Sequence, residues 1–356
     1  MVPQGLECCV GQRQVLLRPN PKVVDGRYLL YALQSPNVQH EIGWNEGTGS
    51  TVSNVRIPVL EALRVPAPPL ALQREVGKVL GALDDRIDLL RQTNATLESI
   101  AQALFKSWFI DFDPVRAKAE GREPEGMDAA TAALFPSEFE ESELGLIPKG
   151  WSYRRADELF DVGIGKTPPR KEPQWFSEGA GDVPWLSIKD MGDEGSIAFR
   201  SSEYLSQEAI DRFNIRVVPD RTVLLSFKLT VGRLSITDGD MTTNEAIAHF
   251  KSRSDSPRYT YLYCFLRAFD FAKLGSTSSI ADATNSKAVK AMNILVPGEE
   301  LTQAFDQHVA ALFERMYANK RQWLCLEQLR DLLLPRLISG KLRLREAEEQ
   351  IDEALA

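Results

Sequence analysis

Two long segments with a heptad pattern constrain the fold of this chain more than any other feature. In residues 71–109 and 299–334, apolar side chains recur at alternating spacings of three and four, over about four heptads in each segment. Such a pattern is typical of helices that pair along a narrow seam, as in a coiled coil. Neither segment contains a proline. The sequence therefore predicts two long helices that pair with each other.

Each of the two seams contains one asparagine. An antiparallel pairing that places Leu80 opposite Leu333 also places Asn94 opposite Asn319. Because a buried asparagine costs stability unless it is hydrogen-bonded, such a pair can fix the register of two helices. We predict this register. The alternative is that the two helices pack on different bodies and leave the asparagines in water.

The helices belong to a unit that occurs twice, about 230 residues apart. Residues 53–108 and 284–337 each begin with a Ser/Thr-Asn step, continue with an apolar, strand-like run, and end in the helix. The apolar runs are Leu63–Pro66 and Ile294–Pro297. The period is far longer than the ~20–50 residues of solenoid repeats, so the sequence predicts a duplicated domain. An antiparallel pair of helices, roughly 45 Å long, would hold two such domains apart, at a distance close to the ~34 Å helical turn of B-DNA.

The remaining patterns predict an α+β protein. One mixed α/β domain is complete, the two long helices form an antiparallel coiled coil, and a second domain is only partial. The predicted divisions are 1–69 (partial domain), 70–110 (first helix), 111–147 (acidic linker), 148–298 (complete domain), 299–343 (second helix) and 344–356 (acidic, frayed tail).

Charge and cysteine content limit the classes of function. Residues 111–143 contain ten carboxylates and three basic side chains, and so carry most of the net charge of −8. The rest of the chain is close to neutral, so net charge does not exclude DNA binding. The four cysteines show neither a disulfide framework nor a metal-ligand spacing, and no signal peptide or membrane-length apolar run occurs. These features predict a protein of the reducing cytoplasm.

Motifs for catalysis are missing from the sequence. A P-loop ending at Gly165-Lys166-Thr167 would need glycine at position 160, which is Phe160. The sequence contains no Asn/Asp-Pro-Pro-Tyr/Phe motif, and the three histidines lack the spacing of metal ligands. We therefore predict no catalytic residues and no metal site, and regard an enzyme as the weakest hypothesis.

Several stretches along the chain match one protein family. They are Pro68-Pro69-Leu70 with Gln73, Leu83-Asp84-Asp85-Arg86-Ile87, Thr96-Leu97-Glu98, Ala103 to Phe109, Asp111 to Val115, Ile147 to Trp151, Gly165 to Pro168, and Leu334 to Leu342. With these stretches the chain resembles the specificity subunit of type I restriction-modification systems over almost its whole length.

The resemblance implies a function in DNA recognition. In that family two target-recognition domains each recognise half of a bipartite DNA sequence, and two helices separate them as an antiparallel coiled coil. The subunit has no catalytic centre and no cofactor. It binds double-stranded DNA, two adenine-methylating subunits and, through the complex, motor-nuclease subunits. S-adenosylmethionine, ATP and Mg belong to those partners.

The first recognition domain departs from the family pattern. It lacks its own Trp and Gly-x-Thr-Pro stretch, so about 90 residues equivalent to Trp151–Thr243 are missing. We expect either a truncated product or a start upstream of Met1. One hypothesis is a specificity subunit, which can also self-associate to bring two recognition domains together. The alternative is a truncated scaffold that binds partner subunits through the coiled coil without specific DNA recognition.

The second domain contains the candidate DNA contacts. Lys166, Arg170 and Lys171 belong to a proline-stiffened loop, while Lys228 and Arg233 belong to a stretch without acidic residues. Arginine contacts guanine, asparagine contacts adenine, and lysine or threonine contacts phosphate. The alternative for any one of these cations is an idle surface charge. The predicted DNA-binding residues are Lys166, Thr167, Arg170, Lys171, Lys228, Arg233, Thr242 and Asn244.

Overall fold

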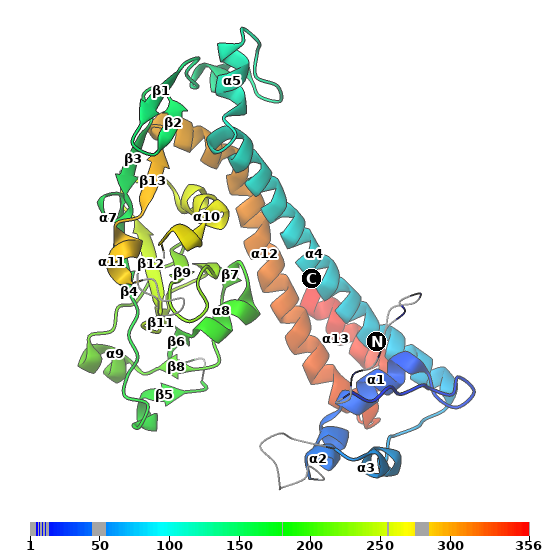
Figure 1. The fold of residues 1–356 in the computed structure, drawn as a ribbon. Coiled ribbons are helices and arrows are strands. Elements are labelled where there is room, and N and C mark those ends of the chain that lie inside the picture. Colours follow the sequence, from blue (N-terminus) through cyan, green and yellow to red (C-terminus); the bar gives the residue numbers. More distant parts are fainter. Residues whose placement is uncertain are drawn as a thin grey trace. The chain divides into compact units, whose positions relative to one another are not determined.

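The computed structural model describes residues 5, 7, 9, 11, 14–44, 55–179, 181–254, 256–274 and 285–355. The Ser/Thr-Asn steps of the repeat lie outside these residues, except for Asn285. The chain divides into two compact units, residues 1–93 with 319–356, and residues 94–318. Each unit contains half of both long helices, α4 (Leu70–Phe109) and α12 (Glu299–Ile338) (Figure 1). The helix bounds agree with the predicted 70–110, whereas the second helix ends five residues before the predicted 343.

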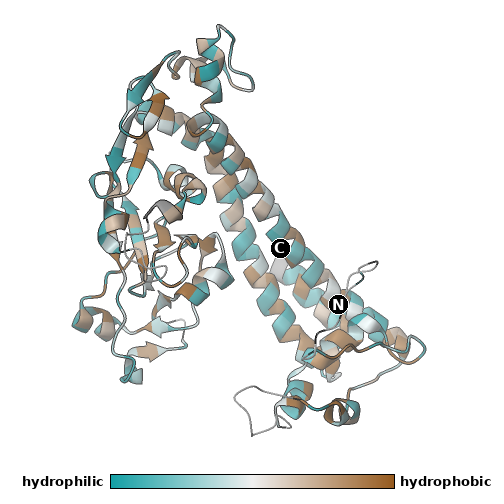
Figure 2. Ribbon diagram, in the orientation of Figure 1, coloured by the Kyte–Doolittle hydropathy of each residue, from teal (hydrophilic) through white to brown (hydrophobic). Residues whose placement is uncertain are grey.

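In the first unit the two helix halves pair in antiparallel directions. Asp84 accepts a hydrogen bond from Arg330 at 2.7 Å, and Arg91 binds Glu327 at 2.6 Å. The predicted register places Asp84 opposite Leu329, one residue from its partner Arg330, and Arg91 opposite Gln322, five residues from its partner Glu327. The buried residues of this helix pair are mostly apolar, although Asn319, Lys320 and Glu327 are also buried, and hydrophobic and hydrophilic positions alternate along both helices (Figure 2). The buried seam residues of this unit include Leu80, Leu83, Ile87, Leu90, Leu326 and Leu333.

The second unit contains the other half of the helix pair. The Asn94 side chain donates a hydrogen bond to the backbone carbonyl of Met316 at 2.9 Å. Further along, Phe105 packs edge-on against Phe305, with ring centroids 5.7 Å apart. The helices thus pair in both units, and the alternative in which they pack on different bodies is wrong. Asn94 is 9% exposed and Asn319 is 1% exposed, so neither asparagine is solvated. A direct bond between the two stays a prediction.

Among the residues that the structure describes, the first unit contains four further short helices, of which the first and the last contribute residues to the core of the helix pair. They are α1 (Gly26–Gln34), α2 (Pro36–Trp44), α3 (Ile57–Ala62) and α13 (Leu344–Leu355). Helices α1 and α2 are separated at Ser35, because Pro36 disfavours helical geometry in the residue before it. The predicted frayed tail is wrong, since it forms α13 and buries Ala347 in the core of this unit.

The two copies of the repeat differ at the predicted strand. Ile294–Pro297 contributes β13 (Asn293–Val296), which pairs antiparallel with β3 (Ser152–Arg155). Leu63–Pro66 forms no strand, and the described residues of the first unit contain no counterpart of β3. A strand needs a partner for its backbone hydrogen bonds, so the same sequence pattern stays irregular in the first copy.

The second unit is built on two main sheets. The larger has the order β4-β12-β9-β10-β7 and the smaller the order β11-β6-β8-β5. The strands of the larger sheet are β4 (Phe160–Ile164), β12 (Ile247–Ser252), β9 (Val223–Ser226), β10 (Leu234–Thr237) and β7 (Ile197–Ala198). Those of the smaller sheet are β11 (Thr242–Thr243), β6 (Val183–Leu186), β8 (Tyr204–Leu205) and β5 (Phe176–Ser177). The other helices of this unit are α7 (Ala156–Leu159), η1 (Pro173–Trp175), α8 (Ile188–Glu194), α9 (Gln207–Phe213), α10 (Tyr259–Ala268), η2 (Phe271–Leu274) and α11 (Ser286–Lys290).

The predicted acidic linker is wrong, because residues 111–147 are folded. They form α5 (Asp113–Ala119), α6 (Ala129–Ala133) and a hairpin of β1 (Phe139–Ser142) and β2 (Gly145–Pro148). The few apolar side chains between the acids are buried in the core of the second unit: Val115, Phe135 and Ile147. The burial of these apolar side chains offsets the entropy cost of ordering the segment. The acidic composition alone suggested that this cost would not be offset.

His249 makes the stability of this fold depend on pH. Burial in β12, reinforced by the nearby Arg216 cation, lowers the pKa of His249 to about 3. The unfolded chain, with a histidine pKa of ~6.5, then takes up the proton first as the pH falls. Stability is complete above pH ~6.5 and decreases toward pH 3, by about 2 kcal/mol at pH 5. Urea titrations at several pH values should show this slope in the wild type and a flatter one in His249→Phe.

Candidate nucleic-acid interface

The loop that follows β4 is fastened to both sheets from its first two residues. The backbone N–H of Gly165 donates to the carbonyl of Ile247 at 3.0 Å, and that of Lys166 donates to Thr243 at 2.9 Å. Trp185 in β6 donates its indole N–H to the carbonyl of Lys166 at 3.1 Å. The loop therefore has a defined course before it reaches the cations that follow.

Only glycine fits at position 165. A Cβ built there would lie 2.1 Å from the carbonyl oxygen of Asn244 and 2.2 Å from the hydroxyl of Thr243. Gly165→Ala should therefore displace the loop and weaken DNA binding at least tenfold, with a stability loss of about 1–3 kcal/mol. Gly179→Ala is the matched control, since a Cβ there meets nothing within 4 Å. Equal DNA affinity in the two variants would show that the course of this loop does not matter for binding.

The predicted cations of this loop have different environments. The Lys166 ammonium donates to the carbonyl of Phe213 at 2.5 Å while its side chain stays exposed. Arg170 binds Glu203 at 2.6 Å and lies over the rings of Phe176 and Trp185, 4.2 and 4.5 Å from their centroids. Lys171 is exposed. Stacking thus holds Arg170 in one orientation. No sequence pattern predicted this contact.

The acid-free stretch forms the hairpin between β9 and β10. Lys228 is half-buried near its turn, with its ammonium 5.4 Å from the centroid of the Phe227 ring. Arg233 donates to the carbonyl of Ile188 at 2.5 Å and so fastens the hairpin to the start of α8. Arg221, from the same stretch, stacks 3.5 Å from the ring centroid of Tyr317 in α12 and is a packing residue.

Thr242 and Asn244 differ in their exposure to solvent. Thr242 is fully buried and donates its hydroxyl hydrogen to the carbonyl of Pro184 at 3.0 Å. The prediction that Thr242 contacts DNA is therefore wrong, because this polar side chain satisfies a backbone carbonyl in the core. The Asn244 side chain accepts from the backbone N–H of Ala246 at 3.0 Å and is half-buried.

Backbone hydrogen bonds bring the two predicted patches together. Residues 243–246 bind the first loop through Thr243 and the second hairpin through Ala246, whose carbonyl accepts from Phe227 at 2.9 Å. Thr167 also donates its hydroxyl hydrogen to Glu245. Lys166, Lys171 and Lys228 therefore belong to loops that share one anchoring segment, although they are far apart in the sequence.

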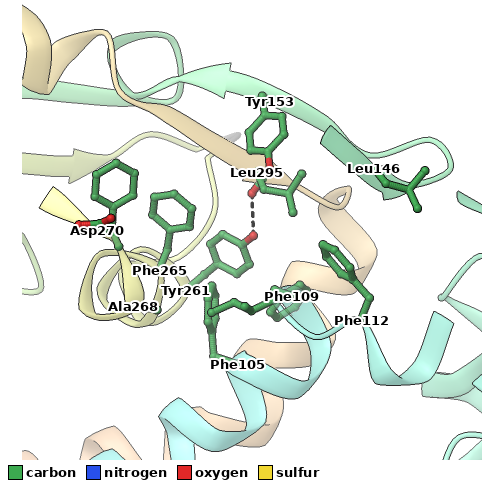
Figure 3. A pocket seen from close by; sticks show the side chains of 12 residues that line it. Phe105, Phe109, Phe112, Leu146, Tyr153, Tyr261, Phe265, Ala268, Asp270 and Leu295 are labelled. Atoms are coloured by element: carbon green, nitrogen blue, oxygen red, sulfur yellow. Dashed lines mark hydrogen bonds between the residues drawn. The ribbon is translucent and has the colours of Figure 1, made fainter. Parts of the chain in front are cut away.

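The aromatic pocket at the end of α4 is not a catalytic site. It has a volume of about 330 Å³, and Tyr261 donates its hydroxyl hydrogen to the carbonyl of Leu295 at 2.6 Å within it (Figure 3). The rings of Phe105, Phe109 and Phe112 point into it, and no nucleophile lies beside a general base among its lining residues. None of the predicted DNA contacts lines this pocket.

The described ranges contain no group of three or more His, Cys, Asp or Glu side chains that could hold a metal ion. No helix within them is both long and apolar enough to cross a membrane.

Comparison with known proteins identifies the family. A family model described as the type I restriction modification DNA specificity domain matches residues 1–99 and 148–314. The chain belongs to this family. The matched ranges leave out the acidic segment and the second half of α12, and they include every predicted DNA contact.

Members of the specificity-domain family resemble the chain over most of its length. The HindI specificity subunit of Haemophilus influenzae is 28% identical, and the match covers 94% of this chain and 81% of that protein. The MjaIX specificity subunit of Methanocaldococcus jannaschii is 26% identical, with coverage of 91% and 70%. A solved type I restriction-modification S subunit from M. genitalium has a TM-score of 0.50 at 17% identity, covering 89% of this chain and 74% of that one, which supports the fold alone.

Proposed function

We propose that this chain is the DNA-specificity subunit of a type I restriction-modification complex. The observation that carries the proposal is the shared anchoring of the basic loop 165–171 and the hairpin 226–233 on residues 243–246. Rigid loops that place cations side by side bind phosphate with little ordering cost. The phosphate backbone of the DNA is contacted by Lys166, Lys171 and Lys228. Phosphates or base edges are contacted by Thr167, Arg170, Arg233 and Asn244.

The chemistry of the complex belongs to its partners. The subunit docks two adenine methyltransferase subunits and, through them, the motor-nuclease subunits, in the cytoplasm. S-adenosylmethionine, ATP and Mg bind to those subunits, and this chain contributes no catalytic residue.

The first unit has a different role in this proposal. Its described residues form α-helices and no strand, unlike the second unit, so we assign DNA recognition in this chain to the second unit. A scaffold that binds partners without specific DNA recognition is the alternative, favoured by the same lack of strands.

A gel shift tests the proposal. The full chain is mixed with the methyltransferase subunit of its own system and with duplexes of different sequence, in the presence of excess competitor DNA. A specificity subunit retains some sequences far better than others. Equal retention of all sequences, together with stable binding of the methyltransferase subunit, would support the scaffold instead.

A further inference from the structure

The hairpin between β9 and β10 presents a leucine to solvent. The Leu229 side chain is 83% exposed, the highest fraction among the large apolar side chains that the structure describes. Its backbone φ of 63° is left-handed, a conformation that costs a non-glycine residue roughly 1–2 kcal/mol. Folding alone favours neither the exposed leucine nor this backbone conformation at such a position.

The hairpin holds Leu229 in place. The buried hydroxyl of Ser226 donates to the carbonyl of Thr230 and accepts from the backbone N–H of Arg233 at 3.0 Å. The N–H of Gly232 donates to the carbonyl of Ser226 at 2.9 Å, which closes the turn. The tip is therefore preorganised, so little side-chain or loop entropy remains to be lost when it enters a partner.

The surroundings of Leu229 favour a polyanion as that partner. Lys228 precedes it, and residues 221–237 contain no Asp or Glu. The hairpin also shares its anchor, residues 243–246, with the loop that contains Lys166. An apolar tip beside cations is the combination that proteins use to bind phosphates while separating stacked bases.

We propose that Leu229 is a wedge that inserts between neighbouring base pairs from the minor groove of the bound duplex, while Lys228 binds the adjacent phosphate. Leucine is among the apolar side chains that fill this role in DNA-bending proteins. The inference rests on the proposed function, because it assumes that the second unit binds DNA. The wedge adds Leu229 to the residues that determine sequence specificity, because the energy needed to open a base step depends on the sequence of that step.

Leu229→Gly is the decisive variant, since glycine favours left-handed geometry and the fold should lose no stability. The probe is a duplex enriched by the wild-type chain, with its methyltransferase subunit, from a pool with a randomised centre. We expect about tenfold weaker binding by Leu229→Gly, the loss expected when one leucine side chain no longer becomes buried. A 2-aminopurine placed at the wedged step should brighten with the wild type and not with the variant. Leu229→Met should retain both effects.

Leu144→Gly is the matched control, because Leu144 is also exposed in a hairpin turn of the second unit, and its loss should leave binding unchanged. Unaltered affinity and fluorescence in Leu229→Gly would overturn the wedge while leaving the proposed function intact. Loss of the methyltransferase subunit from Leu229→Gly, with DNA affinity unchanged, would also overturn it and would assign the leucine to a protein interface. If the wild type enriches no sequence, the proposed function fails, and the wedge fails with it.

Discussion

Replacing Lys166 and Lys171 together by glutamate lowers the affinity of the chain for duplex DNA about a hundredfold at ~0.1 M salt. Both side chains are exposed on the loop that Gly165, Trp185 and Thr243 hold in place. Each lysine that binds a phosphate releases counterions, so the slope of log affinity against log salt should fall by about two in the double variant. Fluorescence polarisation over a series of salt concentrations measures both quantities.

A control variant at two other lysines separates the effect of local contacts on DNA affinity from the effect of net charge. Lys287→Glu with Lys290→Glu makes the same change in net charge on α11 of the same unit, and the predicted site does not include that helix. This control should keep most of the wild-type affinity and its salt slope. If the two double variants lose affinity equally, the effect comes from overall charge, and the loop 165–171 is not part of the interface.

Glu98→Ala should destabilise the second unit by about 3 kcal/mol. The Glu98 side chain is only 14% exposed and accepts hydrogen bonds from Tyr263 at 2.7 Å and Arg267 at 2.9 Å. Its other oxygen accepts from Ser196 at 2.5 Å, so one carboxylate joins α4 to α10 and to the turn before β7. Without it, the buried hydroxyl of Tyr263 loses its acceptor, and an unsatisfied buried group costs more than the bond itself contributes.

The repeat supplies the control for this variant. Leu326-Glu327 occupies the position in the second copy that Leu97-Glu98 occupies in the first. Glu327 binds Arg91 much as Glu98 binds Arg267, because the two arginine side chains are 52% and 53% exposed. Glu98 in addition accepts from the buried hydroxyl of Tyr263, so Glu327→Ala should cost about 1–2 kcal/mol less than Glu98→Ala. Urea unfolding followed by tryptophan fluorescence reports both units, because Trp108, Trp151, Trp175 and Trp185 lie in the second unit, and Trp44 and Trp323 lie in the first. Equal losses in the two variants would contradict the role assigned to Glu98.

Local periodicity made the long helices predictable. The 3–4 spacing is a property of consecutive residues, and it located α4 and α12 and paired Asp84 within one residue of Arg330. Strands were predictable only where a partner exists, as the different fates of Leu63–Pro66 and Ile294–Pro297 demonstrate. Their sequences are similar, and the difference lies in β3, more than a hundred residues from β13.

Side-chain environments were harder to predict, because they depend on distant segments. Charge pattern selected two stretches that the fold brings onto one anchor, but it could not show that Arg233 binds the carbonyl of Ile188. Thr242 looked like a surface residue because threonine is polar, whereas the core uses its hydroxyl to satisfy Pro184. The acidic segment looked unfolded because its composition outweighed a few well-placed apolar residues such as Phe135.

Sequence selection from a random duplex pool tests the central claim, that the second unit recognises DNA, most directly. The full chain, bound to its methyltransferase subunit, is used to enrich duplexes from a pool with a randomised centre, and the bound fraction is sequenced. We expect a defined sequence to emerge with the wild type, and to disappear with the Lys166→Glu, Lys171→Glu variant but not with the Lys287→Glu, Lys290→Glu control. A bound fraction with no enriched sequence, or one that both double variants enrich as the wild type does, would contradict the account.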